Sequence, residues 1–508
     1  VVGHQLYLTH ITKQGNLNMR MKTLSAAVLA GLGVVGTAQA VHVNTDGLGQ
    51  VLLFPYYTVQ NGFDTYVHVV NTTSHVKAVK VRFLEGKNSN EVLDFNLYLS
   101  PRDEWTGAIS RTEGGAGVTS DDTSCIAPTQ LPGIGAAPQE FRNFEYTSDS
   151  VNGTDRTREG YIEVIEMGVV TNDVLAAAAT HPQSGPVPRP EPANCDLIRS
   201  AASANGTLNT DPLAVSRPTG GLYGFASLIN VPEGVKASID AVALDNFFFS
   251  PILFDDLHTD PGSVEPSLEQ VNTDAFVIDG FQVFTTSSVR TAIDTVSMVL
   301  MHDTIYNDYE VDLERISRTD WVVTFPTKRF YVNLGTEDPS VIAPFQQEWD
   351  PTTSTSCDPV SVTYADREEQ EQQFQDDFSP RPPEGGTVLC NEVNTLSVKP
   401  NGAGSDYRTL FGAEFTAANF TLDAGFQSGW MRIDFNGPNA IIPGFDVDLG
   451  LDFLEAYRGL PVIGFAGINN TNNILEIEGV TVLSNYMGTT VHKATRDIEM
   501  ETEIEPIF

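Results

Sequence analysis

The sequence predicts an all-β protein of antiparallel sheets, with immunoglobulin-like sandwiches and long irregular loops. Apolar and polar residues alternate in Val79–Phe83 and in Phe95–Leu99, and Phe63–Val70 is a third strand-sized run. This alternation is the period of a strand with one buried face. Turn-forming stretches such as Asn71–Ser74 and Glu85–Asn90 separate the runs. Immunoglobulin-like sandwiches commonly contain such a series of antiparallel strands. We expect the polar face of the sheet to be solvated.

Further strands follow from the same reasoning. Pro55 places the Gly49–Thr58 run at a sheet edge or at a bulge, because proline has no N–H to donate. The runs Leu222–Val231 and Val235–Leu244 predict a hairpin. A short helix over Asp452–Arg458 competes with a strand as far as Phe453. The remaining expected strands are Glu104–Ile109, Gly160–Met167, Trp321–Phe325, Arg329–Val332, Gln427–Phe435 and Pro461–Ile468.

The chain carries an export signal near its beginning. Arg20 and Lys22 form a basic region, Leu24–Gly36 is apolar, and Ala38–Ala40 is an A-x-A cleavage site. The apolar run is too short to cross a hydrocarbon layer of about 30 Å as a helix. A retained N-terminal anchor is the alternative, but the cleavage site favours a secretory signal peptide. We therefore expect the mature chain to begin at Val41 and to have no transmembrane segment.

A length of 508 residues exceeds one ordinary core and predicts two or three domains. The first eighteen residues precede the signal peptide, and we interpret them as upstream sequence from a wrong start. Five proline residues between 181 and 193 indicate a linker or surface loop. The expected division is upstream residues and signal peptide (1–40), β-sandwich domain (41–180), Pro-rich linker or loop (181–195), second β domain (196–350), acidic and Pro-rich insertion (351–386) and C-terminal β region (387–508).

The charge is strongly acidic, with a formal net charge of −37. The first forty residues contain three basic and no acidic residues, so the mature chain is more acidic still. Such a chain repels phosphate backbones, which argues against nucleic-acid binding, and it disfavours anionic membranes. The carboxylates either keep the surface soluble or are available to divalent cations.

Four cysteines indicate two disulfides in an oxidising compartment. They contain no C-x-x-C pair, which argues against a zinc or redox site. Three pairings are possible, and we expect Cys125–Cys195 and Cys357–Cys390, which close the shorter loops around the two least regular segments. The expected location is secreted, periplasmic or at the cell surface.

Three segments carry a resemblance to known proteins. Lys80–Trp105 (KVRFLEGKNSNEVLDFNLYLSPRDEW), Gly160–Gly168 (GYIEVIEMG) and Thr319–Val332 (TDWVVTFPTKRFYV) resemble an uncharacterised family of secreted, β-rich proteins of Gram-negative bacteria. The resemblance implies export across the inner membrane and a β-rich fold. It supplies no catalytic residues.

Motifs for catalysis are weak. The sequence has no G-x-S-x-G elbow and no H-E-x-x-H. Ser74 and Lys77 match S-x-x-K, but the match falls in a turn, whereas the motif needs a helix. The histidines lack the spacing of metal ligands, and His68 alternates with apolar strand residues. We therefore expect no catalytic centre and no cofactor, with calcium as the one possible exception.

The candidate calcium ligands are four aspartates near the C-terminal end. Asp446, Asp448 and Asp452 share one face of an alternating run, and Asp434 precedes them in a Gly- and Pro-containing region. Carboxylates two residues apart in a strand are about 7 Å apart, so one ion would need loop ligands as well. A solvated strand face is the alternative interpretation.

Aromatic residues are candidate sugar-stacking groups, although burial in the core is their usual role. The candidates are Trp105, Trp321, Trp349, Trp430, Tyr56, Tyr57 and Tyr98. The sequence as a whole predicts a non-catalytic β-sandwich protein with a structural or interaction role, whose partner is a surface protein or a glycan. The rivals are a secreted polymer hydrolase with unrecognised acidic residues and a calcium- or carbohydrate-binding module.

Overall fold

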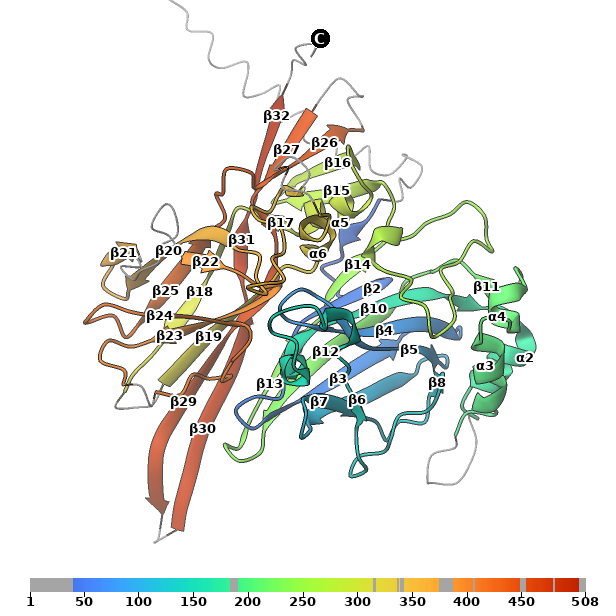
Figure 1. Ribbon diagram of the computed structural model, residues 1–508, viewed down its shortest axis with the longest axis horizontal. Coiled ribbons are helices and arrows are strands. Elements are labelled where there is room, and N and C mark those ends of the chain that lie inside the picture. The colour runs from blue at the N-terminus through green and yellow to red at the C-terminus, as the bar shows by residue number, and fades with distance from the viewer. Residues whose placement is uncertain are drawn as a thin grey trace, which may run out of the picture. The chain divides into compact units, whose positions relative to one another are not determined.

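The structure is a computed structural model, and it describes residues 40–182, 191–313, 317–335, 338, 342–373, 387–404, 407–447, 454–477 and 480–501 (Figure 1). Strands make up 46% of the chain and helices 11%. This helix content lies far below the roughly one third that is typical of globular proteins, and the sheets are built almost entirely from antiparallel pairs. The predicted β class and antiparallel pairing are confirmed.

Two sheets occupy the first half of the described chain. The first has the order β1-β14-β2-β10-β4-β5-β8 with β11 beside β10, and the second has the order β13-β12-β3-β6-β7-β9. Strands β12 and β13 form the predicted hairpin. The strands are β1 (His42–Val43), β2 (Val51–Thr58), β3 (Phe63–Asn71), β4 (Lys77–Glu85), β5 (Glu91–Leu99), β6 (Glu104–Arg111), β7 (Ala116–Thr119), β8 (Cys125–Ala127), β9 (Gln139–Glu140), β10 (Glu159–Val170), β11 (Val215–Ser216), β12 (Leu222–Asn230), β13 (Val235–Asp240) and β14 (Val242–Asp245).

One hydrophobic cluster draws on both of these sheets. It contains Val81 and Phe95 from the first sheet, and Val67 and Trp105 from the second. The Phe95 and Trp105 rings meet edge to face, with centroids 5.6 Å apart, which is a favourable aromatic geometry. The apolar positions of the predicted alternation therefore do form the core.

Four more sheets follow. Their orders are β15-β16-β26-β27-β32, β17-β28, β21-β20-β25-β18-β31 with β22 beside β20, and β24-β23-β19-β29-β30, in which β23 and β24 are parallel. The strands are β15 (Asp274–Asp279), β16 (Gln282–Ser288), β17 (Met301–His302), β18 (Thr304–Glu310), β19 (Ser317–Thr324), β20 (Asp358–Asp366), β21 (Glu371–Gln373), β22 (Thr387–Leu389), β23 (Val393–Lys399), β24 (Ala417–Thr421), β25 (Ser428–Asp434), β26 (Ile441–Asp446), β27 (Leu454–Arg458), β28 (Leu460–Pro461), β29 (Ile463–Ile477), β30 (Val480–Val491), β31 (Lys493–Thr495) and β32 (Asp497–Glu501).

The helices are short. They are α2 (Asp173–Ala179), α3 (Cys195–Ala202), α4 (Thr207–Thr210), α5 (Ile293–Leu300) and α6 (Arg329–Val332), with 3-10 turns η1 (Phe144–Tyr146), η2 (Thr154–Arg158) and η3 (Leu268–Gln270). Within the described residues, none of the helices is both long enough and apolar enough to cross a membrane.

Two local predictions were wrong. Arg329–Val332 forms α6 and not a strand, because the chain turns after β19 at Pro326 and Tyr331 and Val332 pack inward from a helical turn. The helix considered over Asp452–Arg458 is replaced over Leu454–Arg458 by β27, which pairs with β26 on one side and β32 on the other. Residues 452 and 453 lie outside the described residues.

The polar face of β4 is buried, although the sequence predicted that it would be solvated. Every residue of β4 is buried. Lys77 Nζ lies 2.5 Å from Glu166 of β10, and Lys80 Nζ lies 2.7 Å from Asp94 of β5. The loop residues Thr219 and Gly220 accept further hydrogen bonds from Lys77. The alternation of apolar and polar residues is as predicted, but the polar side chains bind charged residues of neighbouring strands and a covering loop, where the prediction had water.

Pro55 marks a bulge inside the sheet. The β2–β10 register passes from the pair Tyr57–Gly160 to the pair Phe54–Ile162, so two residues of β2 oppose one of β10. A residue without an N–H fits such a position. Of the two alternatives for Pro55, the structure has the bulge.

The sheets cross the predicted domain boundary at 181–195. Strand β12 pairs with β3, and β14 pairs with β2, so strands from both sides of this segment share two sheets. The predicted insertion at 351–386 contains β20, an inner strand of its sheet. Residues 183–190 and 374–386, where these two segments are least regular in sequence, lie outside the described residues.

Both disulfides form as predicted. Cys125 and Cys195 join β8 to α3, with Cα atoms 5.1 Å apart. Cys357 and Cys390 join the residues that precede β20 and follow β22, with Cα atoms 3.8 Å apart.

Removing these bonds should cost stability. Replacing Cys125 and Cys195 by alanine should lower the free energy of unfolding by about 2–4 kcal/mol, because the bond restricts a long loop of the unfolded chain. The Cys357–Cys390 disulfide closes a loop of 33 residues, against 70 for Cys125–Cys195. The matched double variant Cys357→Ala with Cys390→Ala should therefore lose about 0.7 kcal/mol less. Urea denaturation measures both losses. Unchanged transition midpoints in both double variants would contradict the expectation.

Candidate functional site

The predicted calcium ligands do not come together in the described part of the chain. Asp434 accepts a hydrogen bond from Thr304 and faces Arg432 at 3.3 Å. Asp446 ends β26 and is largely buried beside Thr286. The two aspartates belong to different sheets, and Asp448 and Asp452 lie outside the described residues. Among the described residues, no group of three or more His, Cys, Asp or Glu side chains is arranged to hold a metal ion.

The S-x-x-K match has a structural role. Lys77 is buried, and its Nζ binds Glu166, Thr219 and the carbonyl oxygen of Gly220. His68 lies at the sheet surface, where its ring stacks on Phe225 at 4.2 Å. Lys77 is thus part of a buried ion pair, and His68 is part of a ring stack on the sheet.

One histidine gathers polar side chains around it. His181 Nδ1 lies 2.7 Å from Ser100 Oγ and 3.5 Å from Asp103 Oδ2. Its Nε2 lies 3.0 Å from Thr123 Oγ1. The hydrogen bond to Asp103 is the main reason why the pKa of His181 is raised.

This cluster lacks the geometry of a Ser-His-Asp triad. In a triad the serine and the carboxylate face opposite nitrogens of the histidine, whereas Ser100 and Asp103 both face Nδ1. Ser100 is also buried, donates to the carbonyl oxygen of Ala179 and accepts from the His181 N–H. The cluster therefore fastens the end of α2 to the turn between β5 and β6.

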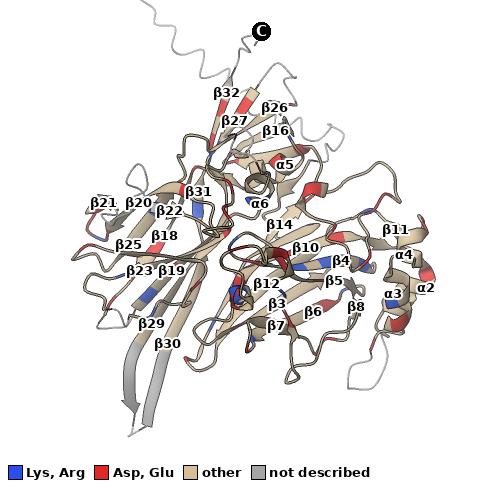
Figure 2. Cartoon of the chain, viewed as in Figure 1, with Lys and Arg blue, Asp and Glu red and all other residues tan. Residues whose placement is uncertain are grey.

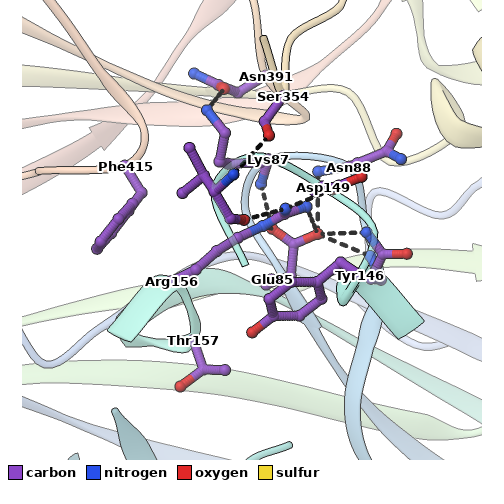
Figure 3. A network of polar contacts seen from close by, with 12 residues as sticks. Glu85, Lys87, Asn88, Tyr146, Asp149, Arg156, Thr157, Ser354, Asn391 and Phe415 are labelled. Atoms are coloured by element: carbon purple, nitrogen blue, oxygen red, sulfur yellow. Dashed lines mark hydrogen bonds and ion pairs between the residues drawn. The ribbon is translucent and has the colours of Figure 1, made fainter. Parts of the chain in front are cut away.

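A second polar network is centred on Arg156, whose side chain has no exposed surface (Figure 3). Its guanidinium forms two hydrogen bonds of 2.6 Å with Glu85 and one of 2.7 Å with Asp149. The guanidinium carbon lies 4.2 Å from the centre of the Tyr146 ring. Glu85 also accepts from the backbone N–H of Lys87. This bidentate, fully buried arrangement orders the chain around the β4–β5 turn.

Two further buried acids, Glu159 and Asp320, accept hydrogen bonds from backbone N–H groups. Glu159 accepts hydrogen bonds from the backbone N–H groups of Glu414, Phe415 and Thr416. Burial raises its pKa from 4.5 to about 7, although these bonds favour the charged form. Burial likewise raises the pKa of Asp320, which accepts from the Phe411 N–H, to about 6. Glu159 thereby holds residues 414–416 against β10, and Asp320 holds Phe411 against β19.

Most of the candidate sugar-stacking residues are in the core. Trp349 is partly buried and packs near Arg156. Trp430 is the exception, since 37% of its surface is exposed. The fully buried candidates are Trp105, Trp321, Tyr56, Tyr57 and Tyr98.

Trp430 stands on an outward strand face together with a second aromatic residue. Along β25, Trp430 and Arg432 alternate with the buried Met431 and Ile433. Across the pair with β18, Arg432 lies opposite Tyr306. The Trp430 and Tyr306 rings lie 6.3 Å apart. Sequence analysis missed Tyr306, because no local pattern shows which strand lies beside β25.

A cavity of about 480 Å³, lined by both apolar and polar side chains, lies at the base of the β29–β30 hairpin. Its lining includes Glu233, Arg318, Tyr407, Thr471 and Asn485. Arg318 Nη2 lies 2.7 Å from Glu233, whose carbonyl oxygen accepts from Asn485, and Thr471 donates to Asn485 at 2.8 Å. The lining side chains thus connect the hairpin to the turn between β12 and β13.

Comparison with known proteins adds no relative: the chain matches no family model, no curated protein and no solved structure.

Proposed function

We propose that this chain is a non-catalytic, extracytoplasmic interaction protein, in which the first two sheets form an immunoglobulin-like sandwich. The hydrophobic cluster that the two sheets share supports the sandwich. The two disulfides support an oxidising compartment, either periplasmic, secreted or at the cell surface. The resemblance to secreted proteins of Gram-negative bacteria fits the same placement.

The observation that carries the proposal is the long β29–β30 hairpin (Figure 1). Strand β29 pairs with β19 from Ile463 to Asn470, but its pairing with β30 continues to Ile477. Within the described residues, the part beyond Asn470 has no ladder partner except the other strand of the hairpin. Unpaired N–H and C=O groups along such edges are a template for an added strand.

The base of this hairpin is fixed. Asn485 donates to the Glu233 carbonyl oxygen, and Thr489 donates to the Ser238 carbonyl oxygen of β13. A fixed base and free edges beyond it are what a docking element requires, because the entropy cost of binding is smaller for a preorganised strand. We infer that an extended segment of a partner protein pairs with this hairpin.

A shortened hairpin tests the proposal. Replacing residues 473–483 by Asn-Gly leaves the register pair Asn472–Ser484 to close a two-residue turn. The exported variant should keep its thermal midpoint but lose most of its association with the cell envelope, measured as the fraction that sediments with it. Phe281→Ser is the control, because Phe281 is an exposed residue in the turn of a different hairpin, between β15 and β16, and this variant should keep its envelope association. Envelope association that is undiminished in the shortened variant would contradict the proposal.

A further inference from the structure

We propose that the outward face of β18 and β25 is a binding platform for an uncharged polysaccharide. This inference goes beyond the proposed function, because it uses a different surface and a different class of partner. Its starting point is a pair of rings, the exposed Trp430 and the half-buried Tyr306, whose centroids lie 6.3 Å apart.

The two rings stand on a regular, well-supported surface. Tyr306 lies between Arg432 of β25 and Lys493 of β31 in register, and Trp430 lies opposite Asp308. Beneath them Met431 and Ile433 are buried and complete the core. Because the inward residues fill the interior, the Trp430 ring is not needed to fill the core. Neighbouring strands are about 4.8 Å apart, so side chains of adjacent strands form one continuous surface, which suits an extended chain of sugar rings.

The chemistry around the rings matches sugar hydroxyls. An aromatic face packs on the apolar face of a sugar ring, and each hydroxyl both donates and accepts hydrogen bonds. The side chains beside the rings supply both kinds of group. Asp308 and Asp434 accept, Arg432 and Lys493 donate, and Ser361, opposite Asp434 in register, can do either.

The charges on the platform favour an uncharged ligand. The outward face carries the acids Asp308, Glu310 and Asp434 and the bases Arg432 and Lys493, so it has no excess of positive charge that would attract an anion; Figure 2 shows acidic residues on β18 and a basic residue on β31. Arg432 is itself paired with Asp434 at 3.3 Å. An anionic polysaccharide would meet a chain whose overall charge is −37. A neutral glucan or chitin-like polymer meets no such repulsion.

Affinity electrophoresis and pull-down of the purified mature protein test the platform. The probes are neutral polymers (cellulose, a β-1,3-glucan, starch and chitin) and two anionic ones (alginate and heparin). The wild type should bind at least one neutral polymer, and Trp430→Ala should weaken that binding at least tenfold. Tyr306→Ala should weaken it as well. Phe144→Ala, which removes a ring that is 76% exposed elsewhere, should bind like the wild type.

The outcomes separate this inference from the proposed function. The hairpin-shortened variant should bind the polymer like the wild type, and Trp430→Ala should keep its envelope association and its thermal midpoint. Binding of anionic polymers alone would overturn the inference. So would the absence of binding to every neutral polymer, or equal binding by Trp430→Ala and the wild type.

Discussion

Arg156→Met should be among the most destabilising single substitutions in this protein. The change removes the guanidinium that binds Glu85 twice and Asp149 once, all in a fully buried setting. Breaking a buried ion pair from one side costs about 3–5 kcal/mol, because the partner charge stays buried without compensation. Equilibrium urea denaturation followed by circular dichroism measures the loss of unfolding free energy.

Two further variants show that the unpaired charge is the cause. The double variant Arg156→Met with Glu85→Gln should be less destabilised than Arg156→Met alone, because less charge remains unpaired. Arg142→Met is the matched control, since Arg142 is exposed, and it should stay within about 0.5 kcal/mol of the wild type. A loss below about 1 kcal/mol for Arg156→Met would show that the network contributes little.

The contribution of the Glu159 carboxyl to the free energy of unfolding should fall as the pH rises from about 5 to about 8. The pKa of Glu159 is about 7 in the folded protein, against an ordinary value of 4.5. A carboxyl with a raised pKa favours folding when it is protonated, so its contribution is complete below pH 4.5 and is lost as the pH rises through 7. The full difference for this residue is about 3 kcal/mol. Asp320 acts in the same direction at lower pH, because its pKa is about 6.

Glu159→Gln isolates this residue. The amide does not titrate, so the free energy of unfolding of the wild type should fall relative to that of the variant as the pH rises from about 5 to about 8. Glu113→Gln changes an exposed carboxyl instead and should keep the wild-type slope. Identical slopes in the wild type and in Glu159→Gln would mean that the Glu159 carboxyl does not titrate in this range.

The strands were predictable because their signal is local. Alternation placed Val79, Val81 and Phe83 in the core, and all three are there. The disulfide pairing followed from loop length and the position of the irregular segments. By contrast, Arg329–Val332 contains aromatic and β-branched residues that favour a strand, and the turn after β19 overrode this preference over a segment of four residues.

What the sequence could not show is which distant residues meet. Lys77 and Glu166 are 89 positions apart, and Arg156 and Glu85 are 71 apart, so a local pattern presents each as an ordinary surface charge. The same limit applies to the platform. Sequence analysis named Trp430 among seven aromatic candidates, but its exposure and its neighbour Tyr306 depend on the pairing of β25 with β18.

Site-specific photocrosslinking in the producing cell tests the central claim, that this protein acts by contact through its hairpin. A photoreactive phenylalanine analogue replaces Tyr486 of β30, which is 62% exposed, and in a second strain it replaces Val174 of α2, which is 68% exposed. Irradiation should give adducts of defined mass from position 486 and none from position 174. The absence of adducts at position 486, or the same adducts from both positions, would contradict the claim.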